Sequence, residues 1–172
     1  MTKPALPSAV TVARFGRAAW FFGNAYEAVV GVPQLIAGSR DRQPGILAGG
    51  SPAPYYAPIT PAAMGGTSVV LARGLKGGAD RRTVVAAGAT LGAALGLSTY
   101  LIRCINIPLL RGEIAPEAQP PLIARWHRVN AVRLVLLIAT EVLVRRIEPS
   151  ARQRWRTAPQ TQSNSPAVKE NS

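Results

Sequence analysis

Hydrophobic residues gather in four stretches of the chain, and the segments between them are rich in charged residues, glycine or proline. The stretches cover residues 18–36, 59–75, 83–107 and 129–147; the third is the longest and the second is weakly apolar. A transmembrane helix needs about 20 predominantly apolar residues. No segment keeps the apolar–polar alternation of a strand. The pattern therefore predicts an all-α protein, built as a four-helix transmembrane bundle.

The first stretch, "AAWFFGNAYEAVVGVPQLI", also invites interpretation as a secretory signal peptide. Lys3, Arg14 and Arg17 precede it, as basic residues precede the apolar core of a signal. Asn24 and Glu27 interrupt that core, which a signal peptide would keep apolar. We therefore favour a retained membrane helix over a cleaved leader.

Prolines mark three expected helix boundaries. Pro33 should bend or break the first span near its outer end, because a proline removes a backbone hydrogen bond. Pro108 should end the third span, since the residue before a proline avoids the helical region. Pro120 and Pro121 suit the first turn of a polar helical lead-in to the fourth span.

The distribution of basic residues predicts the orientation of the bundle. With a cytoplasmic N-terminus, the inner segments up to Arg156 carry 12 Lys and Arg residues and the outer loops carry 5. This asymmetry follows the positive-inside rule and predicts a multi-pass plasma-membrane protein with both ends in the cytoplasm (N-in/C-in). Residues 1–17 would be a cytoplasmic segment and residues 148–172 a disordered basic cytoplasmic tail. The first outer loop, rich in glycine and proline, should be irregular.

Composition removes several classes of function. The net charge is +12, but the basic residues flank apolar runs and are not interleaved with aromatic residues, so the lipid bilayer and not nucleic acid is the expected partner. One cysteine, Cys104, excludes a disulfide within the chain and a cysteine-based zinc cluster. One histidine, His127, excludes a multi-histidine site within one chain. We therefore predict no metal and no cofactor. The Ala-, Gly- and Arg-rich composition is typical of a bacterial protein from a GC-rich genome.

Gly88, Gly92 and Gly96 recur every four residues in the third stretch, "GATLGAALG". Glycines at this spacing let a second helix approach closely in lipid. We therefore predict that these glycines pack the bundle, with the small residues of the second span as one plausible partner. The pattern leaves open whether the contact forms within one chain or between two copies in a homo-oligomer.

Polar residues inside the spans predict a site, because ionisable groups in a membrane are costly and face the bundle interior, pair or serve a function. Arg103, Asn106, Asn130 and Arg133 lie at a similar outer depth in the third and fourth spans, with Trp126 one turn before Asn130. Glu27 lies below them, near the middle of the first span, with Asn24 one turn before it. Glu141 lies about 12 Å deeper than Arg133 along the fourth helix. The common depth predicts a polar pocket that opens toward the outer face.

Each of these residues also has a structural interpretation. Arg103 and Arg133 would reach the outer interface by snorkelling, and Trp126 would be an interfacial anchor. Glu27 would form a structural ion pair with an arginine. Glu141 would pair with Arg145, one turn away, and His127 would be a solvated interface residue.

The motifs "NIP" at the end of the third span and "RWHRVNAVR" at the start of the fourth resemble the anthrone-oxygenase-like family of small four-span membrane proteins. The likeness runs from about Trp20 to Val144. In that family a tryptophan and a His-x-x-Arg pair open the fourth span. Trp126 and Arg133 match this pattern, whereas Asn130 stands where the histidine is expected.

The resemblance implies oxygenation of a phenolic or anthrone-type compound without a cofactor. Glu27 or His127 would remove a proton as the base, while Arg133, Asn130 and Asn106 would hold the resulting anion. Two alternatives stay open: a non-enzymatic membrane protein that binds a ligand or partner, and a small proton-coupled efflux transporter that uses Glu27.

Overall fold

The structure is a computed structural model that describes residues 9–38 and 53–157, and within these residues every regular element is a helix. The predicted all-α class is therefore confirmed. In chain order the elements are α1 (Ala9–Val30), α2 (Val32–Gly38), α3 (Ala53–Lys76), α4 (Arg81–Leu101), the π-helix η1 (Ile102–Asn106), α5 (Ile107–Leu110), the 3-10 helix η2 (Pro116–Ala118) and α6 (Gln119–Thr157).

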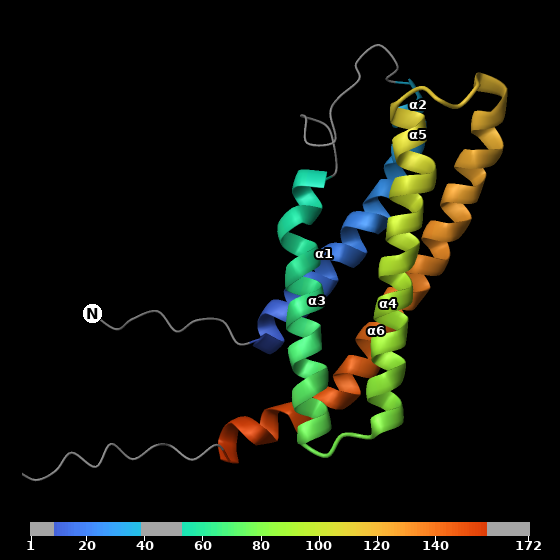
Figure 1. The fold of residues 1–172 in the computed structure, drawn as a ribbon. Helices are drawn as coiled ribbons and strands as arrows, with labels where there is room; N and C mark the ends of the chain where they lie inside the picture. The colour runs from blue at the N-terminus through green and yellow to red at the C-terminus, as the bar shows by residue number, and fades with distance from the viewer. Residues whose placement is uncertain (1–8, 39–52, 158–172) are drawn as a thin grey trace, which may run out of the picture.

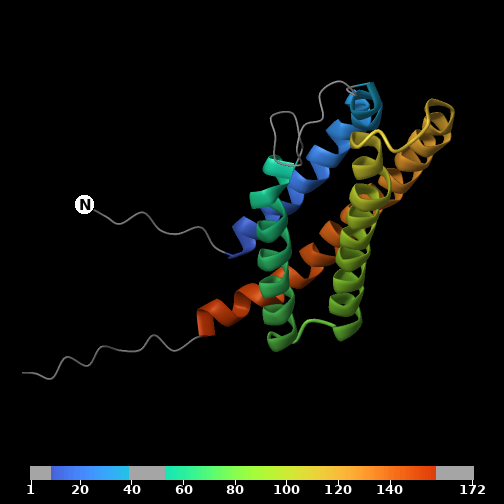
Figure 2. The same cartoon turned by 45° about the horizontal axis from the view of Figure 1, so that its top comes forward.

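Four long helices, α1, α3, α4 and α6, make an elongated bundle (Figure 1). Helices α2 and α5 and the start of α6 lie at one end, which we call the α5 end, and the α3–α4 connection lies at the other. Helices α3 and α4 stand nearly upright, while α1 and α6 run obliquely, an arrangement that persists when the molecule is turned (Figure 2). Helix α1 packs mainly against α3, and α4 packs mainly against α6.

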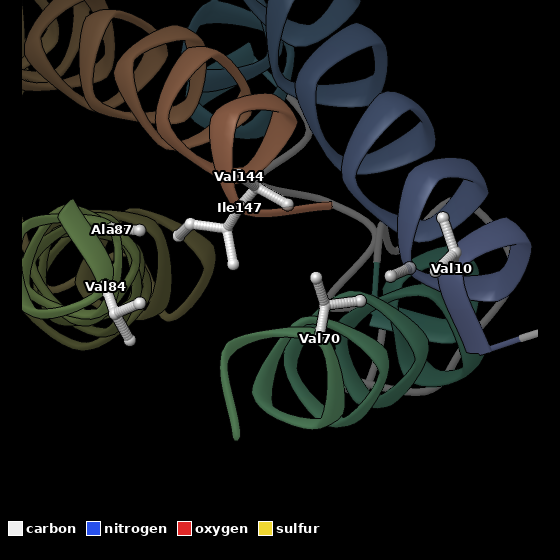
Figure 3. Close-up of a cluster of buried hydrophobic side chains, with 7 residues drawn as sticks. Val10, Val70, Val84, Ala87, Val144 and Ile147 are labelled. Atoms are coloured by element: carbon white, nitrogen blue, oxygen red, sulfur yellow. The ribbon is translucent and has the colours of Figure 1, made fainter. Parts of the chain in front are cut away.

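One hydrophobic cluster joins all four long helices toward the α3–α4 end (Figure 3). Val10 comes from α1, Val70 from α3, Val84 from α4, and Val144 and Ile147 from α6. Two further clusters follow toward the α5 end, one of them around Trp20 and the other around Trp126. The apolar core thus runs the length of the bundle, although it is narrow.

Helices α1 and α3 approach each other closely. A Cβ atom on Gly16 would lie 2.5 Å from the backbone nitrogen of Ala63, and one on Gly66 would lie 2.9 Å from the Cα of Ala13. Only a hydrogen in place of a side chain fits such spacings. Alternating glycine and alanine on the two helices therefore set the α1–α3 distance.

The predicted packing role of Gly88, Gly92 and Gly96 is not seen between the helices of this chain. A Cβ atom on Gly92 or Gly96 would meet nothing within 4 Å, and one on Gly88 would make an ordinary contact with Leu71. The buried face of α4 instead carries residues such as Leu91 and Ala94, which lie on the opposite side of the helix from this stripe.

The break predicted at Pro33 is confirmed. Helix α1 ends at Val30, Gly31 adopts a φ of +68°, and Pro33 lies in the first turn of α2. Glycine suits this position because a positive φ strains residues that carry a Cβ.

The prediction that Pro108 ends the third span is wrong, because the helical rod continues to Leu110. Pro108 cannot donate a hydrogen bond to the carbonyl of Cys104, and its ring would clash with that carbonyl in a regular α-helix. The chain accommodates the proline with the π turn η1, in which the N–H of Ile107 donates to the carbonyl of Ile102.

Helix α4 begins at a side-chain cap. The carboxylate of Asp80 accepts hydrogen bonds from the backbone N–H groups of Arg82 and Thr83 and from the Thr83 hydroxyl. The hydroxyl of Thr83, followed by the two backbone groups, lowers the pKa of Asp80 below its usual value. This cap fixes the start of the most apolar helix at the α3–α4 connection.

Two predicted segments contain helix. Helix α1 begins at Ala9, within the predicted N-terminal segment, and α6 continues to Thr157, so the prediction of disorder is wrong for residues 148–157. The rest of the predicted N-terminal segment (1–8), most of the first outer loop (39–52) and the rest of the predicted tail (158–172) lie outside the described residues.

Within the described part of the chain, one helix is long and apolar enough to cross a membrane. It is the continuous rod Arg81–Leu110, with 30 residues and a mean hydropathy of 1.6 in its most apolar window. The other three long helices carry more charged or weakly apolar residues. Four membrane spans therefore stay a prediction.

Candidate functional site

A cavity of about 190 Å³ lies among the helices in the half of the bundle toward the α5 end. Its walls are largely apolar, with Trp20, Leu95 and Leu101 among the lining residues. The polar side chains that line it come from five elements and are Asn24, Glu27, Tyr56, Thr60, Ser98, Thr99, Asn106 and Arg133. Five of the predicted site residues therefore border one cavity. They are Asn24, Glu27, Asn106, Trp126 and Arg133.

Glu27 and Arg133 form the charged pair of this cavity. A guanidinium nitrogen of Arg133 lies 3.8 Å from Oε2 of Glu27, and both side chains are almost fully buried. The Nε of Arg133 donates to Oδ1 of Asn130 over 3.0 Å, and its Nη1 donates to the Ser98 hydroxyl over 3.2 Å. Arg133 thus joins α1, α4 and α6 through its own side chain.

Asparagine side chains complete the connection between α1 and α6. Asn130, fully buried, donates from Nδ2 to the backbone carbonyl of Asn24 over 3.2 Å. Asn24 in turn donates to the carbonyl of Trp20 and accepts a hydrogen bond from the Tyr56 hydroxyl. These bonds hold the backbone of α1 one turn before Glu27, so the carboxylate has a fixed position relative to Arg133.

The π turn positions the opposite wall of the cavity. Trp126, whose side chain is completely buried, donates from its indole nitrogen to Oδ1 of Asn106 over 3.0 Å. Asn106 is the last residue of η1. Trp126 is therefore a buried structural partner of the π turn and not an interfacial anchor.

Two predicted site residues lie elsewhere. Arg103 is exposed on η1, outside the cavity. Sequence spacing placed Arg103 and Asn106 on one face, but that expectation assumes an α-helix, and the wider π turn separates them. Arg103 also lies two residues from buried Leu101 and buried Ile105, which puts it on the far side of the rod.

His127 is also outside the cavity. Its Nε2 lies 3.0 Å from Nε2 of Gln34, and its ring packs edge-on against Trp126 at 5.2 Å. The structure therefore does not place His127 where it would act as a base on a molecule in the cavity. Of the two candidate bases, Glu27 lines the cavity and His127 does not.

A second ionic group, which the sequence analysis missed, joins α1 and α6 nearer the α3–α4 end. Arg17, only 4% exposed, donates to Glu141 over 2.7 Å and to the hydroxyl of Thr67 over 3.1 Å. Arg14 forms an ion pair with Glu148. Arg17 is thus not a solvated cytoplasmic residue, because two carboxylates on α6 make its burial tolerable.

A signal for this second group was present in the sequence. Arg14 and Arg17 are three residues apart, and Glu141 and Glu148 are seven apart, so each pair shares one face of its helix. The predicted pairing of Glu141 with Arg145 is confirmed at 2.8 Å. The same carboxylate accepts from Arg17 with its other oxygen.

The arrangement in the cavity can move one proton and hold one anion. Glu27 offers a carboxylate, and Arg133 offers a fixed positive charge beside it. Among the described residues, no group of three or more His, Cys, Asp and Glu side chains is placed to hold a metal ion.

In comparisons with known proteins, no family model, no curated protein and no solved structure matches the chain.

Proposed function

We propose that this chain is a four-span plasma-membrane protein whose cavity near the outer face binds a small phenolic compound and oxygenates it without a cofactor. The observation that carries the proposal is the buried Glu27–Arg133 pair at the edge of a largely apolar cavity. A carboxylate beside a cation in apolar surroundings suits a ligand that is neutral on entry and anionic once bound.

The membrane placement is supported by the distribution of apolar and charged residues. Large apolar side chains are exposed on every long helix, among them Phe22 on α1, Val69 on α3, Val85 on α4 and Val135 on α6. Buried positions include Arg17, Glu27, Arg133 and Glu148. Water-soluble monomers seldom expose large contiguous apolar surfaces, whereas lipid favours apolar residues outside and charged residues within.

The topology has a direct test by cysteine labelling. In a Cys104→Ser background, Ala118→Cys should react with a membrane-impermeant maleimide in intact cells, because η2 would lie on the outer side. Arg81→Cys, at the α3–α4 connection, should react only after the membrane is opened. The reverse pattern would contradict the N-in orientation, and labelling of both in intact cells would contradict the spans.

The size of the cavity limits the ligand. A cavity of about 150 Å³ in another protein holds benzene, so about 190 Å³ suits one ring or two fused rings. A three-ring anthrone would require the helices to move apart. Within the phenolic class, we therefore propose compounds with one or two rings.

The proposed reaction starts with transfer of the phenolic proton to Glu27, and Arg133 stabilises the phenolate. The phenolate then reacts with molecular oxygen at a ring carbon. That carbon and the phenolic oxygen lose one hydrogen each, the carbon gains one oxygen atom, and the second oxygen atom leaves as water. Oxygen is the oxidant, and the product is a quinone.

The experiment uses 1-naphthol with the full chain in lipid nanodiscs, with empty nanodiscs as the blank. Binding is measured by calorimetry, turnover by oxygen uptake and by the formation of 1,4-naphthoquinone. Arg133→Gln should lower binding of the anion and abolish turnover. Arg128→Gln, an exposed arginine on the same helix, should change neither.

The outcomes separate the alternatives. Saturable binding without turnover would favour the non-enzymatic ligand-binding protein, since the cavity would then serve binding alone. Absence of binding would refute the proposal. An efflux transporter for cations is disfavoured by the position of Arg133, because a cationic substrate at Glu27 would meet a positive charge 3.8 Å away.

A further inference from the structure

A second, larger cavity of about 630 Å³ lies between α1 and α6, apart from the phenolic site. One part of its lining is charged, with Arg14, Arg17, Glu141 and Arg145. The other part is apolar and consists of Ala18, Phe21, Phe22, Leu137, Ile138 and Val142. We call this cavity the α1–α6 groove. Phe22 is two turns from Arg14, and Leu137 is two turns from Arg145, so the groove extends about 12 Å along the helices from its charged end to its apolar end.

The charges at the polar part of the groove do not balance. Three arginines (Arg14, Arg17 and Arg145) face two carboxylates, those of Glu141 and Glu148. Among these five groups one positive charge is therefore left over. An anion that carries a single negative charge would neutralise it.

The arginines also differ in how accessible they are. The side chain of Arg17 is only 3% exposed and its Nη2 makes no hydrogen bond, with the nearest carboxylate oxygen, on Glu148, 3.7 Å away. Arg14 and Arg145 have side chains that are 49% and 70% exposed. Arg17 therefore supplies a buried positive charge, while Arg14 and Arg145 can contact a headgroup directly.

We propose that the α1–α6 groove binds one anionic phospholipid. Its phosphate contacts Arg14 and Arg145, and one acyl chain lies along Phe22, Leu137 and Ile138. The inference rests on the membrane placement proposed above, because that placement puts the charged part of the groove at the cytoplasmic leaflet. Anionic lipids attract basic side chains at that depth.

The shape of the groove fits this occupant better than a peptide or a soluble anion. An acyl chain needs an apolar surface and no hydrogen bonds, which the Phe and Leu walls offer. A free phosphate would leave that apolar surface uncovered. The headgroup charge matches the single excess positive charge, which favours an anionic over a zwitterionic lipid.

The test compares two lipids with identical acyl chains, phosphatidylglycerol and phosphatidylcholine. The full chain is purified in detergent, each lipid is titrated, and native mass spectrometry counts the lipids that stay bound. We expect one phosphatidylglycerol to bind with at least fivefold preference over phosphatidylcholine. One arginine near an anionic headgroup contributes roughly this factor.

Two kinds of variant locate the site. Arg145→Gln should reduce the preference about fivefold, whereas Arg146→Gln, its exposed neighbour outside the groove, should leave it unchanged. Ala18→Trp fills the apolar part of the groove and leaves all charges in place, so it should lower the affinity for both lipids. Ala131→Trp, at an exposed position outside the groove, is its control.

Three results would overturn the proposal. Equal retention of the two lipids would show that the groove does not select charge. Equal effects of Arg145→Gln and Arg146→Gln would show that the selecting charge lies elsewhere. A dimer that Ala18→Trp abolishes would assign the groove to a second copy of the chain. Binding of 1-naphthol to Arg145→Gln should stay normal, so a failure of the lipid site and a failure of the phenolic site are distinguishable.

Discussion

Replacing Gly16 by alanine should weaken the bundle, although alanine is the better helix former. A Cβ atom at this position would lie 2.5 Å from the backbone nitrogen of Ala63 and 2.9 Å from the carbonyl carbon of Ala62. Both neighbours are backbone atoms of α3, so no side-chain rotation relieves the clash. Helix α3 must move away from α1.

The magnitude follows from two opposing effects. Overpacking of a tight contact costs about 1–3 kcal/mol, while glycine to alanine in a helix gains about 1 kcal/mol. Gly92→Ala provides the matched control, because a Cβ atom there meets nothing within 4 Å. The two variants share the gain in helix propensity, so their difference in unfolding free energy isolates the packing cost of about 1–3 kcal/mol.

The assay is unfolding of the detergent-solubilised chain by SDS, followed by circular dichroism. We expect Gly92→Ala to be as stable as the parent or more stable, and Gly16→Ala to be the least stable of the three. If Gly16→Ala matched Gly92→Ala, the close approach of α1 and α3 would be refuted. If Gly92→Ala were the weaker variant, the α4 stripe would pack against something that this fold does not contain.

Substitutions at three further positions test separate parts of the fold. Asp80→Ala should lower the thermal stability of α4. Because hydrogen bonds lower the pKa of Asp80 in the folded state, the stability that Asp80 contributes should be present at neutral pH and lost as the pH falls through that lowered value; in Asp80→Asn this loss at acidic pH should be absent from melting curves. Trp126→Phe should cost about 1–3 kcal/mol in the same SDS assay, because the side-chain oxygen Oδ1 of Asn106 loses its hydrogen-bond donor. Glu148→Gln should cost about 3–5 kcal/mol, because Arg17 stays buried with one carboxylate fewer.

The helices could be predicted from the sequence because hydropathy and proline positions act locally. The four stretches coincide with the four long helices, and the break at Pro33 is where the sequence places it. The ends of α1 and α6 could not be predicted in the same way. Residues 9–17 and 148–157 contain charged residues that look solvated in isolation, and only the pairing of Arg17 with Glu141 and Glu148 explains why Arg17 and Glu148 are buried.

The candidate site could be predicted in part for a similar reason. Glu27, Arg133 and Asn130 were identified because each is costly in an apolar helix, and the structure brings them together. Arg103 is equally costly in an apolar helix and is nevertheless exposed. The cost of a polar residue does not indicate which face of the helix the residue occupies. Ser98 was not identified, because a hydroxyl in a helix often donates its hydrogen bond to a backbone carbonyl of the preceding turn. Ser98 does so to the carbonyl of Ala94.

The two ionic groups together explain why α1 and α6 are antiparallel neighbours in one register. Along α1, Arg14 and Arg17 come first and Glu27 follows; along α6, Arg133 comes first and the two glutamates follow. The antiparallel arrangement pairs Glu27 with Arg133 at one level and the two arginines with the glutamates at the other. A parallel arrangement would set arginine beside arginine and glutamate beside glutamate, and burial would make that repulsion severe. The buried charges of the two ionic groups therefore also specify how α1 and α6 meet.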